Sequence, residues 1–216
     1  MATLEIRALS AGYGRARVLF DIDLEVRRGE VVALLGRNGA GKSTTLKAIM
    51  GLVPPSSGQV LLDGRDLSRL PPYQVARLGL GYVPEERRIF TDLTVSENLE
   101  VGRQPTRAAA PTWTDEKLLE LFPALAALRD RRGSRMSGGE QQMLCIARTL
   151  AGNPSAILLD EPSEGLAPVV VEQVGRAIVE LKRAGVAVLL AEQNQHFTGR
   201  VADRTYLLET GIIRSP

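Results

Sequence analysis

Residues 36–43 read Gly-Arg-Asn-Gly-Ala-Gly-Lys-Ser, and this stretch decides how the surrounding chain folds. The spacing G-x-x-x-x-G-K-S is typical of a loop that wraps around phosphate. Its glycines let the backbone curl until several N–H groups point at one anion. Lys42 adds a positive charge for the outer phosphates, and the Ser43 hydroxyl suits the magnesium ion that accompanies them. We expect the nucleotide contacts to include Gly36, Arg37, Asn38, Gly39, Ala40, Gly41, Lys42, Ser43 and Thr44.

The segments on both sides of this loop fit a strand and a helix. Before it, residues 31–35 form the apolar run Val-Val-Ala-Leu-Leu, which is typical of a buried parallel strand. After it, residues 44–50 place Leu46, Ile49 and Met50 on one helical face, and Gly51 is a stop signal. The phosphates would therefore lie at a helix N-terminus, where the helix dipole favours negative charge.

The bulk composition limits the possible partners and compartments. The chain has 216 residues, enough for one domain with an attached subdomain, and 27 basic residues nearly balance 25 acidic ones. This balance gives no reason to expect a nucleic-acid partner. The single cysteine, Cys145, fits a reducing compartment. Because no signal peptide and no apolar run of ~18 residues is visible, we expect a soluble chain that reaches a membrane only through partners.

Along the chain, short strands and helices alternate around a helix-rich insert. Residues 1 to about 84 contain short strands, the phosphate loop and its helix, whereas about 85–150 are helix-rich, with Leu118, Phe122 and Leu125 near a helical period. Strands and helices alternate again from 151: a strand at 156–160, a helix at 168–184, a strand at 186–191 and a hairpin at 205–213. This order predicts one α/β domain over 1–216, with a mostly parallel sheet and a helical lobe.

Two acids end the predicted strand at 156–160. An apolar strand that ends in Asp160 and Glu161 brings both acids to the carboxyl edge of the sheet, beside the phosphate loop. Asp160 is positioned to hold magnesium, and Glu161 to act as general base or to position the attacking water. Two acids at a strand end can also be a solvated turn, but a phosphate loop in the same chain favours the catalytic interpretation.

A second anion site is predicted at residues 137–140. Ser137 and Glu140 form an S-x-x-E capping box at the start of a predicted helix. Between them, Gly138 and Gly139 leave bare N–H groups at the positive end of that helix. A well-capped helix explains the same residues, yet a single nucleotide does not need two such sites from one chain.

In this order, the loop at 36–43, the Met-Ser-Gly-Gly-Glu-Gln segment at 136–141 and the Leu-Leu-Asp-Glu-Pro segment at 158–162 resemble the ATP-binding subunits of ABC transporters. The resemblance covers nearly the whole chain. It implies a P-loop NTPase core (1–84 and 151–216), an N-terminal antiparallel β subdomain and a helical subdomain (about 85–150). It also implies that the serine-glycine motif contacts the γ-phosphate of ATP held by a second subunit. Tyr13, between two glycines, matches the aromatic residue that stacks on adenine in that family.

Further segments resemble one branch of the family, the ATPases of branched-chain and other hydrophobic amino-acid importers, with urea and amide importers close by. These segments include residues 81–85, 93–99, 161–168 and 192–194. In this branch Glu85 stands where the general family has the loop glutamine that links the nucleotide site to the membrane partner. Ala167 likewise replaces an aspartate, and Gln193 replaces the histidine that contacts the γ-phosphate. The only histidine, His196, is interpreted as an ordinary helix-surface residue.

From this resemblance we expect an ATP hydrolase that uses ATP and Mg²⁺. Glu161, Lys42 and Gln193 would be catalytic, and Ser43, Asp160 and Glu85 would face the metal. The implied partners are a second ATPase subunit, identical or related, transmembrane permease subunits and, indirectly, a periplasmic binding protein. The expected location is the cytoplasmic face of the cell membrane. Two other classes stay open: a non-transport ABC ATPase acting in assembly, and a regulatory module that hydrolyses little ATP.

Overall fold

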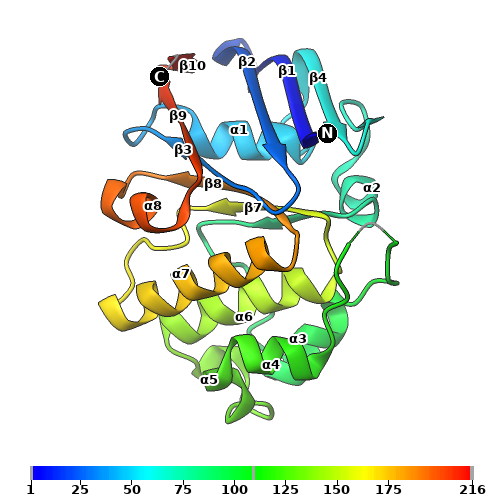
Figure 1. The fold of residues 1–216 in the computed structure, drawn as a ribbon, viewed down its shortest axis with the longest axis vertical. Coiled ribbons are helices and arrows are strands. Elements are labelled where there is room, and N and C mark those ends of the chain that lie inside the picture. The colour runs from blue at the N-terminus through cyan, green and yellow to red at the C-terminus, as the bar shows by residue number, and fades with distance from the viewer. Residues whose placement is uncertain (1, 109, 215–216) are drawn as a thin grey trace.

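The computed structural model describes residues 2–108 and 110–214, which form two sheets with helices between and below them (Figure 1). One sheet has four antiparallel strands in the order β2-β1-β4-β5. Its strands are β1 (Ala2–Tyr13), β2 (Ala16–Arg27), β4 (Pro55–Leu62) and β5 (Arg65–Asp66). This sheet is the antiparallel subdomain that the family resemblance implied.

The second sheet has six strands in the order β10-β9-β3-β8-β7-β6. All neighbouring strands run parallel except β9 and β10, which form the expected C-terminal hairpin. The strands are β3 (Val31–Leu35), β6 (Leu80–Val83), β7 (Ala156–Asp160), β8 (Ala187–Glu192), β9 (Arg204–Glu209) and β10 (Ile212–Arg214). The expected α/β class with a mostly parallel sheet is therefore confirmed.

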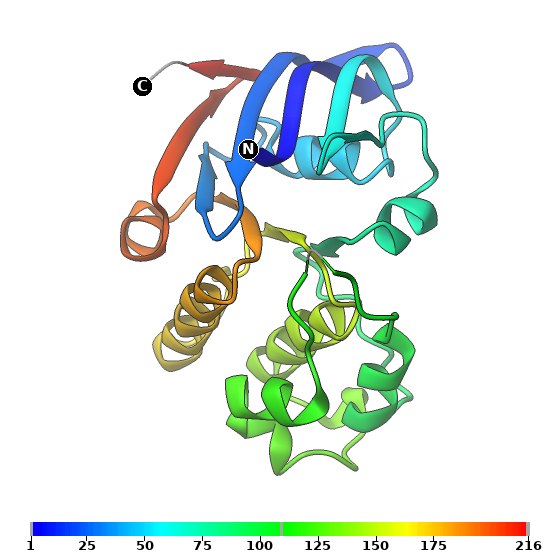
Figure 2. The ribbon, with the colours of Figure 1, turned by 45° about the vertical axis from the view of Figure 1, so that its right-hand side comes forward.

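Helix α1 (Lys42–Ile49) lies between the two sheets (Figures 1 and 2). Alternate residues of the central strands face opposite sides, as the period of two in a strand requires. On β3, Val32 and Leu34 join the core that contains α1 and the antiparallel sheet, whereas Val31 joins the core on the other face. Both faces of this strand are therefore buried, which explains its continuous apolar sequence.

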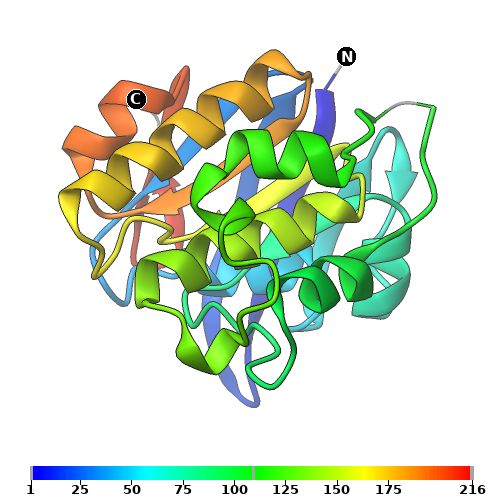
Figure 3. The ribbon, with the colours of Figure 1, turned by 90° about the horizontal axis from the view of Figure 1, so that it is seen from below.

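The remaining helices lie mostly on the other face of the six-stranded sheet, where α6 and α7 run across it (Figures 1 and 3), although one of them packs through Val75 in the core that contains α1. They are α2 (Pro72–Arg77), α3 (Val95–Gly102), α4 (Asp115–Leu121), α5 (Pro123–Ala126), the short 3₁₀ helix η1 (Gly133–Arg135), α6 (Gly138–Ala151), α7 (Pro168–Arg183) and α8 (Gln195–Val201). Of these, α3, α4, α5, η1 and α6 fall in the predicted helical lobe. The division of the chain at about 84/85 and 150/151 stays a prediction.

The helical period over Leu118, Phe122 and Leu125 spans two short helices rather than one. All three side chains are buried, as the period predicts. Phe122, however, has φ −126° and ψ 74°, which ends α4 before α5 begins. The physical reason is Pro123, because a residue that precedes proline is disfavoured in helical conformation.

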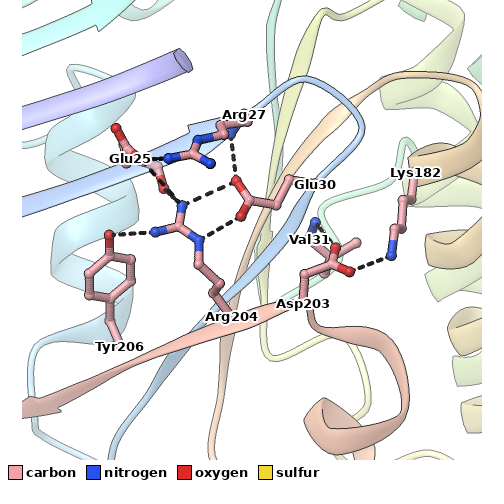
Figure 4. A network of polar contacts seen from close by, with 8 residues as sticks. All are labelled: Glu25, Arg27, Glu30, Val31, Lys182, Asp203, Arg204 and Tyr206. Atoms are coloured by element: carbon pink, nitrogen blue, oxygen red, sulfur yellow. Dashed lines mark hydrogen bonds and ion pairs between the residues drawn. The ribbon is translucent and has the colours of Figure 1, made fainter. Parts of the chain in front are cut away.

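A polar network attaches β9 to the start of β3 (Figure 4). The Arg204 guanidinium donates from Nε to Oε1 of Glu30 at 2.6 Å and from Nη2 to Oε2 at 3.1 Å. Next to it, Asp203 accepts a hydrogen bond from the backbone N–H of Val31 at 3.0 Å and pairs with Lys182. Bidentate arginine–carboxylate pairs restrict the relative orientation of the two side chains as well as attracting them, so this network helps to set the position of β9 beside β3.

Within the described ranges, 2–108 and 110–214, no helix is long and apolar enough to cross a membrane.

Candidate functional site

The loop between β3 and α1 borders a cavity of about 280 Å³ at the carboxyl edge of the parallel sheet. Gly41, which precedes α1, has φ 110°, a conformation that residues with a side chain rarely adopt. A Cβ atom at this position would also lie 3.0 Å from Leu19. The described residues that line the cavity are Val18, Asn38, Gly39, Gly41, Lys42, Ser43, Thr44, Glu85, Glu161 and Glu164. Of the other loop residues predicted to bind phosphate, Gly36, Arg37 and Ala40 lie in the same turn but do not line the cavity.

The Lys42 ammonium is held at the floor of the loop. Nζ donates to the carbonyl oxygens of Gly36 at 2.9 Å and Arg37 at 3.3 Å. It also lies 3.0 Å from Oε1 of Glu161, and the two side chains are only 3% and 9% exposed. This nearly buried ion pair joins the predicted phosphate-binding lysine to the predicted catalytic acid.

Asp160 ends β7 directly beside Ser43. The Ser43 hydroxyl donates to Oδ1 of Asp160 at 2.9 Å, and the Tyr82 hydroxyl donates to Oδ2 at 3.1 Å. Asp160 is 1% exposed, and this burial raises the pKa of its carboxyl group above the ordinary value despite the two hydrogen bonds. A hydroxyl and a carboxylate at the edge of a phosphate cavity are the oxygen ligands that Mg²⁺ prefers, so these residues fit the metal.

Glu161 and Glu164 form a carboxyl pair on the same cavity wall. Glu161 has a left-handed backbone, with φ 46°. Burial alone would raise the pKa of Glu161, but contacts with Glu164 and Lys42 outweigh it and lower the pKa. The hydrogen bond to Glu161 is the largest cause that raises the pKa of Glu164, to about 7. The shared proton therefore belongs to Glu164, and Glu161 is ionised near neutral pH, as a general base requires.

Glu85 and Gln193 occupy different positions relative to the cavity. Glu85 lines it, and its predicted place beside the metal stays a prediction. Gln193 follows β8 in an exposed loop, and its backbone N–H donates to Oε2 of Glu192 at 3.2 Å. Gln193 is not among the described residues that line the cavity, so its predicted contact with the γ-phosphate remains a prediction.

The predicted second anion site lies at the start of α6. The capping box is present: Ser137 Oγ accepts from the backbone N–H of Glu140 at 3.3 Å, and Oε2 of Glu140 accepts from the N–H of Ser137 at 2.7 Å. A Cβ atom at Gly138 would meet the Arg87 guanidinium at 2.5 Å, and one at Gly139 would meet Val170 at 2.8 Å. None of the described residues around the phosphate cavity comes from 137–140. The two predicted anion sites of one chain are therefore separate.

Tyr13 lies at the end of β1, next to the turn into β2, and is 52% exposed. The same hairpin contributes Val18 to the cavity, but Tyr13 itself does not line it. Stacking of Tyr13 on adenine thus stays a prediction. His196 lies on α8 with an exposed side chain, in agreement with its interpretation as a helix-surface residue.

Sequence reasoning missed three polar residues of this region: Tyr82 on Asp160, Glu164 on Glu161, and the buried Glu192. Tyr82 and Glu192 belong to segments that resemble the importer branch, but a resemblance of segments assigns no contact to a side chain. Glu164 follows Glu161 by three residues in a tight turn, where Glu164 N–H donates to the Glu161 carbonyl oxygen at 3.1 Å. An acid at this spacing is the signal that would have identified it.

Comparisons with known proteins place this geometry in one family. The sequence model described as "ABC transporter" matches residues 19–164. The chain is 44% identical over 210 residues to a high-affinity branched-chain amino acid transport ATP-binding protein, BraG, of Pseudomonas aeruginosa, covering 97% of this chain and 90% of the relative. It is 40% identical over 213 residues to the lipopolysaccharide export system ATP-binding protein LptB of Escherichia coli, covering 98% and 88%. A nucleotide-free ATP-binding cassette from an ABC transporter superposes with a TM-score of 0.85 at 27% identity, covering 100% of this chain and 90% of that one.

Proposed function

Since the chain belongs to the ABC transporter family as an ATP-hydrolysing subunit, we propose that it drives uptake of branched-chain or other hydrophobic amino acids through a membrane permease. The observation that supports its chemistry best is that Lys42, Ser43 and Glu161 line one cavity, while Asp160 accepts a hydrogen bond from Ser43. The substrate class rests on the 44% identity to BraG and on the segments that resemble the amino-acid importer branch.

In the proposed mechanism, the Lys42 ammonium exchanges its ion pair with Glu161 for one with the outer phosphates of ATP. The loop N–H groups and Lys42 stabilise charge on the phosphates, and Glu161, released from the ion pair, orients the attacking water and accepts its proton. Ser43 and Asp160 would hold Mg²⁺, with Glu85 nearby. When bound, this ion neutralises charge on the phosphate oxygens. Removing one such stabilising contact typically slows the chemical step by about 10²–10³-fold.

We propose that a second ATPase subunit completes each site. The Ser137–Gly138–Gly139–Glu140 helix start has N–H groups without helical partners, and none of these residues lines the described cavity of the same chain. If two chains face each other head to tail, this helix start meets the γ-phosphate held by the partner. The partner is a second copy or a related ATPase, and the branch resemblance favours a related one. ATP then favours the closed pair because it contacts both chains only in that state.

The helical lobe would transmit closure to the permease. Phe90 is 48% exposed, and the Arg148 guanidinium lies over its ring at 5.0 Å from the ring centre. Exposed arginines of the same lobe are Arg88, Arg129, Arg131, Arg132 and Arg135, with Arg87 partly exposed. An exposed aromatic ring beneath a cation, on a lobe with further exposed arginines, suits docking of a permease segment. The chain would thereby lie on the cytoplasmic face of the membrane. A periplasmic binding protein would be an indirect partner, because it would contact the permease and not this chain.

Lipopolysaccharide export is a second candidate, because the identity to LptB is 40% over a similar length. The two candidates differ in the molecule that stimulates hydrolysis. We would purify the chain with its co-purifying permease, reconstitute the complex in vesicles and measure ATP turnover. Stimulation by a branched-chain amino acid with its binding protein supports the proposal. Stimulation by lipopolysaccharide alone, or co-purification of an assembly complex without a permease, would refute it.

A further inference from the structure

Glu192, the last residue of β8, is a buried carboxylate that binds two loops at once. It is 2% exposed. Its Oε1 accepts from the Ser163 hydroxyl at 2.6 Å and from the Ser163 N–H at 3.1 Å. Its Oε2 accepts from the N–H groups of Gln193 and Asn194, both at 3.2 Å. Each carboxylate oxygen therefore serves a different loop.

Hydrogen bonds, rather than a cation, compensate the burial of this carboxylate. A buried charge is costly unless donors surround it. Within residues 2–108 and 110–214, no lysine or arginine forms an ion pair with Glu192. The four donors match the roughly four acceptor positions of an ionised carboxylate, so its hydrogen-bonding capacity is filled.

The two loops held by Glu192 carry the residues proposed to act on the γ-phosphate. Ser163 follows Glu161 by two residues, and Gln193 follows Glu192 directly. A backbone hydrogen bond also connects Glu192 to the predicted phosphate loop, because Gly36 N–H donates to the carbonyl oxygen of Glu192 at 3.4 Å. Glu161 N–H donates to the neighbouring Ala191 carbonyl oxygen at 2.9 Å. Three segments around the nucleotide thus meet at the end of β8.

We propose that Glu192 is a positioning residue that couples the loop after Glu161 to the loop carrying Gln193. Through this carboxylate, the two loops take up their positions around the γ-phosphate as one unit. Glu192 touches neither ATP nor the attacking water in this account. The inference rests on the proposed roles of Glu161 and Gln193 in hydrolysis, and it adds the residue that fixes their relative position.

The proposal requires a carboxylate, not merely a polar side chain. Glutamine has the same length but only one acceptor oxygen, and its NH₂ group would face N–H donors on the other side. Glu192→Gln therefore loses the bonds to one of the two loops. Loss of positioning reduces kcat, because the bonds formed at the transition state depend on alignment, while binding of ATP to the phosphate loop is retained.

We would first measure ATP turnover of Glu192→Gln over a range of ATP concentrations. The expected result is a kcat about tenfold lower with a KM within about twofold of the unsubstituted chain. A matched control is Asn153→Ala: Asn153 is 5% exposed and its side chain also bonds two backbone segments, at Trp113 and Gln104. The control is expected to lose thermal stability with little change in kcat. An unchanged kcat in a folded Glu192→Gln protein would overturn the proposal.

A double-mutant cycle separates positioning from mere structural support. In a Gln193→Ala background, Glu192→Gln should reduce kcat by much less than about tenfold, because the positioned side chain is already absent. If Glu192→Gln does not fold, the cycle is built from Ser163→Ala and Gln193→Ala, because both residues donate hydrogen bonds to the Glu192 carboxylate. Effects that simply multiply in the cycle overturn this inference alone. An unchanged kcat in Gln193→Ala by itself would overturn the proposed role of Gln193 as well.

Discussion

Lys42 Nζ lies 3.0 Å from Oε1 of Glu161, so the lysine proposed to bind phosphate and the proposed general base neutralise each other. Nζ also donates to two carbonyl oxygens of the loop, which leaves the three ammonium protons occupied. Bound ATP would compete with the Glu161 carboxylate for Lys42. In the proposed mechanism, phosphate binding and release of the base are therefore the same event.

Lys42→Ala should abolish measurable ATP binding and turnover. It removes the charge that contacts the outer phosphates and leaves the 9%-exposed Glu161 carboxylate without its cation. Binding of a fluorescent ATP analogue and phosphate release are the measurements. Lys117→Ala, on the exposed surface of α4, is the matched control and should behave like the unsubstituted chain. Normal turnover in Lys42→Ala would contradict the assignment of the loop.

Glu161→Gln should bind ATP but hydrolyse it about 10²–10³-fold more slowly, because an amide cannot accept the proton of the attacking water. Trapped ATP should then make the variant accumulate as a dimer, which light scattering behind a sizing column detects. Glu120→Gln, an exposed substitution on α4, should stay active. A variant that remained monomeric at saturating ATP would argue against pairing of two chains.

Tyr82→Phe should raise the Mg²⁺ concentration needed for half-maximal turnover by about tenfold. The substitution removes the hydroxyl that donates to Oδ2 of Asp160 at 3.1 Å and thereby loosens the carboxylate that Ser43 also contacts. Turnover is measured in a Mg²⁺ titration at saturating ATP. Tyr73→Phe, at a 59%-exposed position, is the control. An unchanged Mg²⁺ requirement would show that Tyr82 does not orient Asp160.

The stability of the folded chain should decrease slightly as pH rises from 6 to 8. Contact with Glu161 raises the pKa of Glu164 to about 7, above the ordinary value of a glutamate. A raised pKa means that protonated Glu164 stabilises the folded chain at low pH and that this contribution is lost as the pH rises through about 7. The effect is small because Glu164 is exposed and solvent screens the pair. Urea unfolding at both pH values measures it.

Glu164→Gln should remove this pH dependence, because the amide does not titrate. Glu172→Gln is the control: Glu172 is a surface residue of α7 whose contact with Arg176 lowers its pKa, so it does not titrate in this window. The same pH dependence in Glu164→Gln as in the unsubstituted chain would contradict the assignment of the shared proton.

Much of the fold follows from the sequence, because buried strands and helices require apolar residues at characteristic spacings. The buried strands β3 and β7 read as short apolar runs, and the Ser137–Glu140 box marks the start of α6. The break at Phe122 was foreseeable from Pro123, but the helical period across it concealed the change of direction. Strand order was not accessible from periodicity, because pairing depends on contacts between distant segments.

For the site, motifs gave the residue types and the structure gave the contacts. The loop at 36–43 and the acids at 160–161 are predictable because phosphate and metal chemistry restricts residue type and spacing. The Tyr82–Asp160 and Glu161–Glu164 contacts were not, since each depends on how a turn or a neighbouring strand directs a side chain. Glu192 belongs to a segment that resembles the importer branch, but its four donors come from two loops whose meeting only the fold determines.

The central claim, that a second chain completes each site, is tested most directly by mixing two inactive variants. Lys42→Ala destroys the phosphate loop, and Gly138→Asp places a negative charge at the start of α6. In a mixed pair, one site receives an intact loop from the Gly138→Asp chain and an intact helix start from the Lys42→Ala chain. Given that the unsubstituted chain hydrolyses ATP alone, the account predicts that the mixture regains turnover while each variant alone stays inactive. No turnover at any mixing ratio would contradict it.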